Sequence, residues 1–225
     1  MSRASRDRIL AAIGSSQNAV MPADTETLTI SERLQRRPRG PLPILPGDLE
    51  ATFVMHLKAA AATCSTVAAA EQAEQQKERQ IGQQVLQWLQ QHNAALSLTR
   101  SESEMLDSVD WPEALDVSKC CDNTISDTTV CEAFCAIAET GSLVLLSSRA
   151  APTTLNYLPD NFICLLHRQT IVPHIEDVWQ RVRTESAGMP RALNIITGPS
   201  RTADVEQTIQ LGAHGPRRMH VILYN

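Results

Sequence analysis

The stretch Thr197–Asn225, TGPSRTADVEQTIQLGAHGPRRMHVILYN, contains the pattern that decides the fold. Leading into it, Leu193–Thr197 (LNIIT) is a short apolar run with β-branched residues, which is typical of a buried strand. Gly198-Pro199 predicts a turn, and Ser200 or Thr202 is suited to cap a helix after it. The chain is therefore expected to leave a strand, turn sharply and enter a helix.

The same stretch continues with a helical pattern and a second strand. Val205 and Ile209 are four residues apart on one face of a helix that Gly212 is suited to end. A turn at 214–216 then precedes a predicted strand over 219–224. The order strand, helix, strand predicts a βαβ crossover, and ligands of open α/β sheets bind at the carboxyl end of such a first strand.

Strands and helices alternate through most of the chain before this unit. Apolar, β-branched runs predict strands over 63–67, 95–99, 117–120, 128–131, 142–147, 162–166 and 170–172. Helical spacing of apolar residues predicts helices over 49–57, 71–92 and 175–182, a weak one over 105–115, and one or two turns over 132–138. The alternation predicts an α/β fold, a three-layer domain with a largely parallel sheet.

The amino-terminal region has a different composition. A short helix is expected over 3–13, and residues 14–46 are polar, contain five prolines and show no sustained period. The chain is therefore divided into an amino-terminal helix and linker arm, 1–46, and an α/β domain, 47–225. Residues 1–40 contain seven Arg and four Asp or Glu, which fits either docking on an acidic partner or a solvated tail.

Composition and charge exclude several functional classes. A net charge of −5 and a pI near 5.7 disfavour a nucleic-acid scaffold. No run reaches the ~18 apolar residues of a membrane span, and the apolar part of the first 14 residues is too short for a secretory signal. Their Arg-rich character leaves a transit peptide open, although Asp7 disfavours one, so a cytoplasmic protein is expected.

Six cysteines raise the question of a metal site. Four of them, Cys120, Cys121, Cys131 and Cys135, lie close in sequence, but their spacing fits neither a CxxC pair nor a ferredoxin run. Neighbours on a strand face opposite sides, so an adjacent pair cannot easily bind one metal. Buried free thiols and no metal are expected.

Three blocks of sequence carry a resemblance to a known family. They are AIAETGSLVL at 136–145, PTTLNYLP at 152–159 and GPSRTADVEQTIQLGAHGPRRMHVIL at 198–223. In this order they resemble the signatures of the LutC/YkgG family, the LUD-domain lactate utilisation protein C group. Before about Val130 only the general pattern matches. The resemblance implies a NagB/RpiA/CoA-transferase-like architecture.

The first block places a carboxylate and a hydroxyl at a glycine turn before a buried strand. Glu139 is the candidate catalytic residue, as general base or nucleophile, and Thr140 and Gly141 are candidate ligand-binding residues. Glycine is needed there if the backbone adopts positive φ or approaches a ligand closely. The alternative is that Glu139 only braces the turn.

The last block resembles an anion cradle. Gly198, Ser200, Arg201 and Thr202 combine a turn, two hydroxyls and a guanidinium at the expected start of a helix, where a carboxylate or phosphate would bind. Ordinary helix capping explains the hydroxyls equally well. His214 is a candidate ligand-binding residue or a turn residue. We expect Glu139 to lie beside Ser200 and Thr202, since both turns would end at one rim of the sheet.

The middle block supplies the last candidates. Thr154 and Asn156 lie in a polar segment between two strands, which suits either ligand binding or turn chemistry. In the resembled family a histidine often follows the Leu-Pro-acid group. Asn161 stands in that place here, which puts a role of such a histidine in doubt for this chain.

The resemblance implies a function as well as a fold. It implies a component of a LutABC-type system that oxidises L-lactate to pyruvate, with iron–sulfur clusters in LutA-like and LutB-like partner subunits and no cofactor in this chain. The sequence contains no cluster, flavin or dinucleotide motif, so a partner or substrate-positioning subunit is expected. The alternatives are a stand-alone sugar-phosphate isomerase or CoA/acyl-transfer enzyme that uses Glu139, and a regulatory ligand-binding protein.

Overall fold

The computed structural model describes residues 5–12, 29–37, 39–67, 74–122, 125–186, 188–202, 210–211 and 215–225. Its contacts divide the chain into two compact units, Met1–Leu42 and Pro43–Asn225. The sequence-based division at 46/47 stays a prediction. None of the described helices is both long and apolar enough to cross a membrane.

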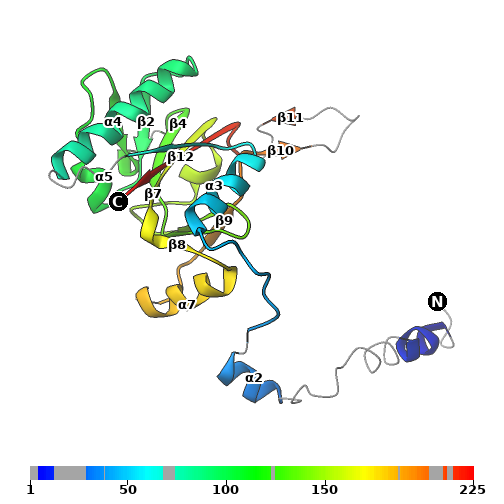
Figure 1. Ribbon diagram of the computed structural model, residues 1–225. Coiled ribbons are helices and arrows are strands. Elements are labelled where there is room, and N and C mark those ends of the chain that lie inside the picture. Colours follow the sequence, from blue (N-terminus) through cyan, green and yellow to red (C-terminus); the bar gives the residue numbers. More distant parts are fainter. Residues whose placement is uncertain are drawn as a thin grey trace. The chain divides into compact units, whose positions relative to one another are not determined.

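The second unit is built on a parallel sheet of six strands (Figure 1). In spatial order these are β1 (Thr63–Thr66), β12 (Arg218–Tyr224), β7 (Asn161–His167), β4 (Thr128–Glu132), β2 (Ser97–Arg100) and β3 (Asp116–Lys119). Every neighbouring pair in it is parallel. Such a sheet needs cover on both faces, because its strands are apolar on both sides.

A second sheet has four short strands. They are β8 (Ile171–Val172), β5 (Cys135–Ile137), β6 (Ser142–Leu146) and β9 (Leu193–Ile196), in that order. β5 is parallel to β8, whereas β6 is antiparallel to both β5 and β9. The remaining elements of this unit are helices α3 (Leu49–Ala59), α4 (Glu74–Gln91), α5 (Glu104–Ser108), α6 (Thr154–Tyr157) and α7 (Ile175–Glu185), and 3-10 turns Cys120–Asp122 and Arg168–Thr170.

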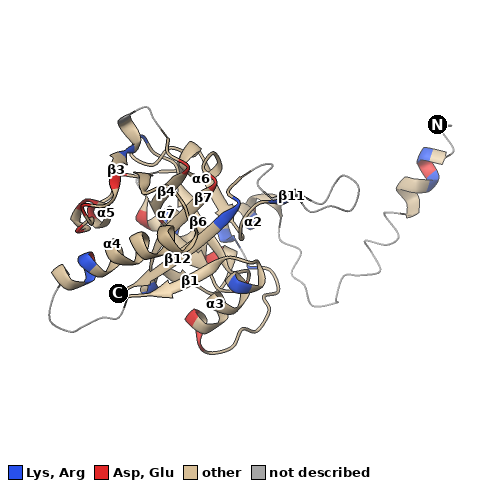
Figure 2. Cartoon of the chain, turned by 90° about the horizontal axis from the view of Figure 1, so that it is seen from above, with Lys and Arg blue, Asp and Glu red and all other residues tan. Residues whose placement is uncertain are grey.

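Strand β7 shows how the layers form. Its side chains alternate between two cores, because successive residues of a strand face opposite sides. Phe162, Cys164 and Leu166 pack with α3 and the second sheet, while Ile163 and Leu165 pack with α4 and α5. Figures 1 and 2 show α4 and α5 on one side of the sheet and α3 on the other. The predicted three-layer α/β fold with a largely parallel sheet is thus confirmed.

The helices that carry apolar stripes lie where their spacing predicts. In α4 the stripe Ile81, Val85, Trp88 and Leu89 is buried against the parallel sheet. In α3, which the Asp48 side chain caps by accepting from Ala51 N at 2.9 Å, the apolar residues Phe53 and Leu57 are fully buried. Helix α7 packs Val178 and Val182 against the second sheet.

The closing unit of the chain differs from the prediction. β9 and β12 belong to different sheets, so they do not form one βαβ crossover. Where the helix was expected to begin and end, Arg201–Thr202 (β10) and Gln210–Leu211 (β11) form an antiparallel ribbon. Residues 203–209 lie outside the described residues.

The physical reason is visible at the base of this ribbon. Ser200 N donates to Pro216 O at 2.8 Å, which brings the two ends of the segment side by side. A helix of ten residues would separate its ends by about 15 Å. The antiparallel pair satisfies backbone groups without that separation.

The one or two helical turns predicted over 132–138 were also wrong, since β4 ends at Glu132 and Cys135–Ile137 is a strand between β8 and β6.

The first unit contains a helix that the sequence analysis missed. Besides the helical residues 5–12, α2 spans Ile30–Arg36. Thr29 and Glu32 form a capping box, in which Thr29 N donates to Glu32 Oε2 at 2.8 Å. No residue of α2 is buried, and Ile30 and Leu34 are 79% and 69% exposed.

Candidate functional site

A carboxylate–imidazole pair forms the centre of the candidate site. Glu139 follows β5, and His174 lies directly before α7. His174 Nδ1 lies 2.8 Å from Glu139 Oε2, and the His174 side chain is only 10% exposed, against 30% for Glu139. A carboxylate only accepts, so His174 donates from Nδ1, and the neutral ring keeps Nε2 free to take a proton. This is the arrangement of an oriented general base.

Backbone contacts hold the pair in place. Ala138 N donates to Val172 O at 2.8 Å, and Glu139 N donates to Pro173 O at 3.1 Å. These bonds continue the parallel β5–β8 ladder beyond its last strand residues. His174 N donates to Asp177 Oδ2 at 3.2 Å, which fixes the start of α7. The two side chains therefore meet because two adjacent strands end together.

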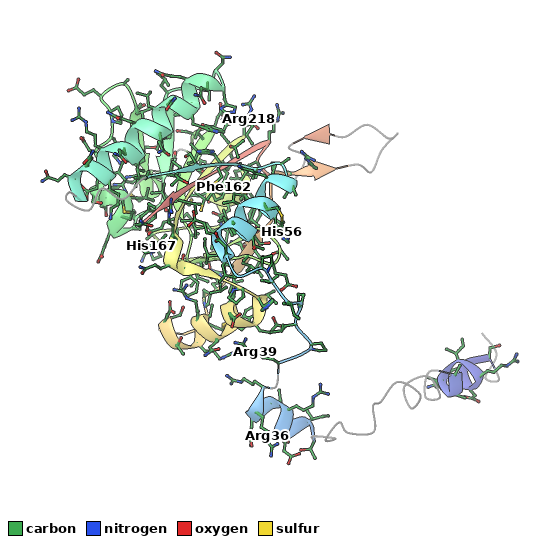
Figure 3. All side chains as sticks on the ribbon, in the orientation of Figure 1. Arg36, Arg39, His56, Phe162, His167 and Arg218 are labelled. Carbon is green, nitrogen blue, oxygen red and sulfur yellow. The ribbon has the colours of Figure 1, made fainter. Side chains whose placement is uncertain are left out.

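A second histidine approaches the same turn from α3. His56 Nδ1 lies 2.5 Å from the carbonyl oxygen of Glu139. That oxygen can only accept, so His56 carries its proton on Nδ1 and presents Nε2 as an acceptor when neutral. Figure 3 labels His56 on α3. Two imidazoles thus contact Glu139, one at its carboxylate and one at its backbone.

A chain of three hydroxyls joins the Glu139 turn to the turn after β9. Thr140 Oγ1 and Ser142 Oγ are 2.6 Å apart, and Ser142 Oγ and Thr197 Oγ1 are also 2.6 Å apart. Ser142 is buried, whereas Thr140 and Thr197 are exposed. The Thr140 turn and the Thr197 turn therefore lie side by side at one end of the second sheet, rather than at the rim of the parallel sheet as expected.

The backbone conformation and a close contact explain why the predicted turn contains a glycine, Gly141. Gly141 has a φ of 67°, in the left-handed region that favours glycine. A Cβ at this position would lie 2.4 Å from Leu57 N in α3, which real structures do not allow. The close approach at Gly141 is thus to a helix of this chain, and it brings His56 within reach of Glu139.

The predicted cradle is only partly described. Gly198 forms a turn with φ of 73°, Ser200 is bound to Pro216, and Arg201 is exposed. Thr202 is in β10, so the expectation that these residues begin a helix was wrong. His214 lies outside the described residues. Whether Ser200 and Thr202 share a ligand with Glu139 stays a prediction.

The middle-block candidates lie at the other end of β6 from Glu139. Thr154 is exposed at the start of α6, and Asn156 is buried on it. Thr129 of β4 donates its hydroxyl to Leu155 O at 2.7 Å and so anchors this short helix on the parallel sheet. No hydrogen bond in the described structure joins Thr154 or Asn156 to Glu139. A ligand-binding role for them stays a prediction.

Asn161, which stands where the resembled family often has histidine, has a clear set of contacts. Its side chain donates to Thr128 Oγ1 at 3.1 Å and accepts from Arg218 Nη1 at 3.2 Å. Its backbone N donates to Asp127 O at 2.9 Å. It is buried and joins the first residues of β4, β7 and β12. In this chain the position braces the amino ends of the parallel strands.

Sequence reasoning missed four residues of the site: His56, Ser142, His174 and Thr197. Three come from elements far apart in the sequence, and no local pattern marks a histidine that will meet a distant carboxylate. Ser142 stands in the quoted block AIAETGSLVL, so only its proximity to Glu139 offered a signal.

Half of the six cysteines are buried thiols. Cys131, Cys135 and Cys164 are buried, Cys64 and Cys120 are partly buried, Cys121 is exposed, and none of the six forms a disulfide. Burial raises the pKa of Cys131 and of Cys135 to about 12, and that of Cys64 to about 11. Within the described ranges, no three His, Cys, Asp or Glu side chains are grouped so that they could hold a metal ion.

Comparison with known proteins bears on this site. The sequence over residues 76–224 matches the LUD domain. It is 38% identical over 80 residues to "Lactate utilization protein C" of Anoxybacillus flavithermus, covering 36% of each protein. It is 34% identical over 90 residues to the protein of the same name in Bacillus subtilis, covering 39% of this chain and 38% of that one. The chain thus spans less than half the length of these relatives.

A solved structure shares the fold. The crystal structure of a DUF162 family protein from Deinococcus radiodurans superposes with a TM-score of 0.58 at 21% identity, covering 81% of this chain and 100% of that one. The resemblance inferred from the three sequence blocks is confirmed, because the matched domain contains all three and extends over most of the chain. The chain belongs to the LUD domain family.

Proposed function

We propose that this chain is a cytoplasmic component of a lactate-utilisation system that oxidises L-lactate to pyruvate. It acts as a partner or substrate-positioning subunit, and LutA-like and LutB-like subunits carry the iron–sulfur clusters. The similarity to several proteins named "Lactate utilization protein C" supports the pathway. The 2.8 Å contact between His174 Nδ1 and Glu139 Oε2 is the observation that carries the chemical part.

The pair suits one half of the reaction. Oxidation of lactate breaks the O–H and Cα–H bonds and releases two electrons and two protons as the carbonyl forms. His174 Nε2 accepts the hydroxyl proton, and Glu139 stabilises the imidazolium that results. The two electrons and the proton of the Cα–H bond need acceptors that the side chains of this chain do not provide. Iron–sulfur clusters of the partner subunits would take the electrons one at a time, and solvent would take the proton.

The substrate also carries a carboxylate, which needs its own partner. The hydroxyl of Thr140 belongs to one of the two turns that Ser142 joins, and the exposed Arg201 begins β10 four residues after Thr197 of the other turn. A guanidinium binds a carboxylate through two parallel hydrogen bonds, which fixes its orientation as well as its position. We assign Arg201 and Thr140 to this role.

A second candidate function is favoured by the environment of Glu139. Its Oε2 accepts from His174, whereas Oε1 takes part in no hydrogen bond with any residue that the structure describes, and the side chain is 30% exposed. An accessible carboxylate oriented by an imidazole suits a nucleophile or base of a stand-alone sugar-phosphate isomerase or CoA/acyl-transfer enzyme. Turnover of a sugar phosphate or a thioester by the purified chain would establish this alternative.

We assign residues 1–40 as the surface that binds the partner subunits. They combine seven Arg with four Asp or Glu, and α2 exposes Ile30 and Leu34 one turn apart. A helix with an apolar pair and basic neighbours is suited to a groove with an acidic rim. Because these residues belong to a separate compact unit, removing them is expected to leave the α/β domain folded.

The test is affinity purification of the tagged full chain from its native cell, followed by iron analysis and identification of the bound proteins. We expect two cluster-bearing subunits and iron with the full chain, and a loss of both with a variant lacking residues 1–40. A variant carrying Arg183→Gln on the exposed surface of α7 is the control and should retain both. Recovery of the full chain without iron or partner subunits would contradict the proposal.

A further inference from the structure

A hollow of about 630 Å³ lies at the opposite end of β6 from the Glu139 site. Glu139 precedes β6, whereas the hollow begins at Ser147, just beyond its last residue. Five strand residues separate the two places by about 17 Å. The volume falls within the range of small-molecule sites, which is about 300–1,000 Å³.

Two arginines give the lining of the hollow positive charge. Arg149 and Arg191 line it, and none of the described residues that line it is Asp or Glu, although the whole chain has a net charge of −5. Neither guanidinium forms a hydrogen bond or ion pair with any residue in the described part of the chain. Two unpaired arginines at one concave site are typical of phosphate recognition.

Hydroxyl groups add further donors. Ser147 Oγ accepts from Ala192 N at 2.8 Å, and Ser148 Oγ accepts from Ala151 N at 3.0 Å. Each hydroxyl is thus fixed as an acceptor and keeps its own proton to donate. Thr153 also lines the hollow, and its side chain makes no capping hydrogen bond to α6. The site therefore presents two guanidinium groups and three hydroxyl donors.

The loop that forms the hollow is hydrogen-bonded to residues that follow two strands of the parallel sheet. Glu102 N donates to Ala150 O at 2.8 Å, and Cys120 Sγ lies 3.2 Å from the same oxygen. Glu102 and Cys120 follow the carboxyl ends of β2 and β3. The strand order reverses beside them, since the chain runs from β2 to β3 and then to β4 on the other side of β2. Ligands of parallel sheets bind at such reversal points.

We infer that this hollow is a second ligand site, distinct from the Glu139 site, and that it binds the phosphate group of a small organic phosphomonoester. The guanidinium groups and hydroxyls bind the phosphate oxygens. Pro152 and Ala192 form an apolar wall beside them, which suits the organic part of the ligand. A phosphate alone would leave most of the volume to water.

The test is calorimetric titration of the full chain with ribose 5-phosphate, at fixed ionic strength, with inorganic phosphate, ribose and citrate as comparison ligands. We expect ribose 5-phosphate to bind more tightly than inorganic phosphate, and ribose and citrate to show no binding. Arg149→Gln and Arg191→Gln should each weaken binding at least tenfold, because each removes charge-assisted hydrogen bonds. Arg183→Gln, an exposed arginine outside the hollow, is the matched control.

A binding site at Glu139 would give a different pattern. Glu139→Gln should leave the affinity for ribose 5-phosphate unchanged, and amide chemical-shift changes should lie at 147–153 and 191–192. Shift changes confined to the Glu139 turn, equal losses in Arg149→Gln and Arg183→Gln, binding of citrate as tight as that of the phosphoester, or no binding at all would each overturn the inference. The experiment uses no lactate, so it is independent of the proposed lactate function.

Discussion

Gly141 and Gly198, from two different turns, both pack against the carboxyl-terminal end of α3. Both have positive φ, 67° and 73°. A Cβ on Gly141 would lie 2.4 Å from Leu57 N, and one on Gly198 would lie 2.3 Å from Ala60 O. The carboxyl-terminal part of α3 therefore holds the Glu139 turn and the Thr197 turn together.

This relationship makes both glycines sensitive to substitution. Gly141→Ala and Gly198→Ala should each lower the free energy of unfolding by about 2–4 kcal/mol, because the left-handed backbone is strained and the contact with α3 must open. Urea denaturation measures the change. Gly47→Ala is the control, since a Cβ there meets no atom within 4 Å. Equal stability of all three variants would contradict the close packing.

How much of the fold and of the candidate site could be predicted from the sequence depends on how far apart in the sequence the interacting residues lie. The core residues of α3, α4 and β7 followed from local periodicity, because one apolar face must be buried wherever the helix or strand lies. The α2 capping box Thr29-x-x-Glu32 was a readable local signal that was overlooked. The partner of Glu139 could not be predicted, because His174 reaches it through β5–β8 pairing between strands 35 residues apart.

The prediction for the closing segment was wrong at Arg201–Thr202 and Gln210–Leu211, which pair as antiparallel strands. Ser200 and Thr202 are suited to a helix cap locally, but Ser200 N donates to Pro216 O. Such contacts between residues far apart in sequence override weak local preferences.

The Glu139–His174 pair should be needed for activity and not for folding. Glu139→Gln keeps the shape of the side chain but removes the charge that stabilises an imidazolium, so lactate-dependent activity of the assembled system should fall at least ~100-fold. The melting temperature should fall by no more than about 4 °C. Glu185→Gln is the control, because it removes a carboxylate paired with Arg181 at 2.7 Å on the exposed side of α7. Full activity of Glu139→Gln would exclude the pair from the chemistry.

Stability should depend on pH through His220. Burial, and to a smaller extent the charge of His92, lowers its pKa from 6.5 to about 4. Thr63 Oγ1 lies 2.8 Å from Nδ1 of the His220 ring, and Ser65 Oγ lies 3.0 Å from Nε2. Ser65 donates to Gln84 Oε1 at 2.6 Å, so it accepts from Nε2–H. Nδ1 of the neutral ring then accepts from the Thr63 hydroxyl, which lies nearer to it than to Met219 O at 3.3 Å.

The direction in which stability changes with pH follows from proton uptake on unfolding. Between pH 4 and 6.5 the unfolded chain binds a proton at this histidine that the folded chain does not, so stability rises with pH across this window and levels off above it. The contribution reaches about 3 kcal/mol. Urea midpoints measured over this range should show the slope in the native chain and a smaller slope in His220→Gln. Identical slopes in both would contradict the assignment.

The thiols should differ sharply in reactivity. Cys121 is exposed, whereas Cys131, Cys135 and Cys164 are buried, and burial raises the pKa of each of these three thiols. Iodoacetamide should therefore modify Cys121 in the folded chain and the other three only after denaturation. Mass spectrometry of peptides from labelled samples measures this. Rapid labelling of Cys131 in the folded chain would show that the core opens readily.

The most direct test of the proposed function is lactate-dependent dye reduction, measured first with the isolated chain and then with the chain mixed with its partner subunits. We predict no reduction by the isolated chain, because no side chain accepts a hydride or carries electrons onward. The mixture should reduce the dye, and the mixture made with Glu139→Gln should do so at least ~100-fold more slowly. Dye reduction by the isolated chain would contradict the subunit assignment and favour a stand-alone enzyme.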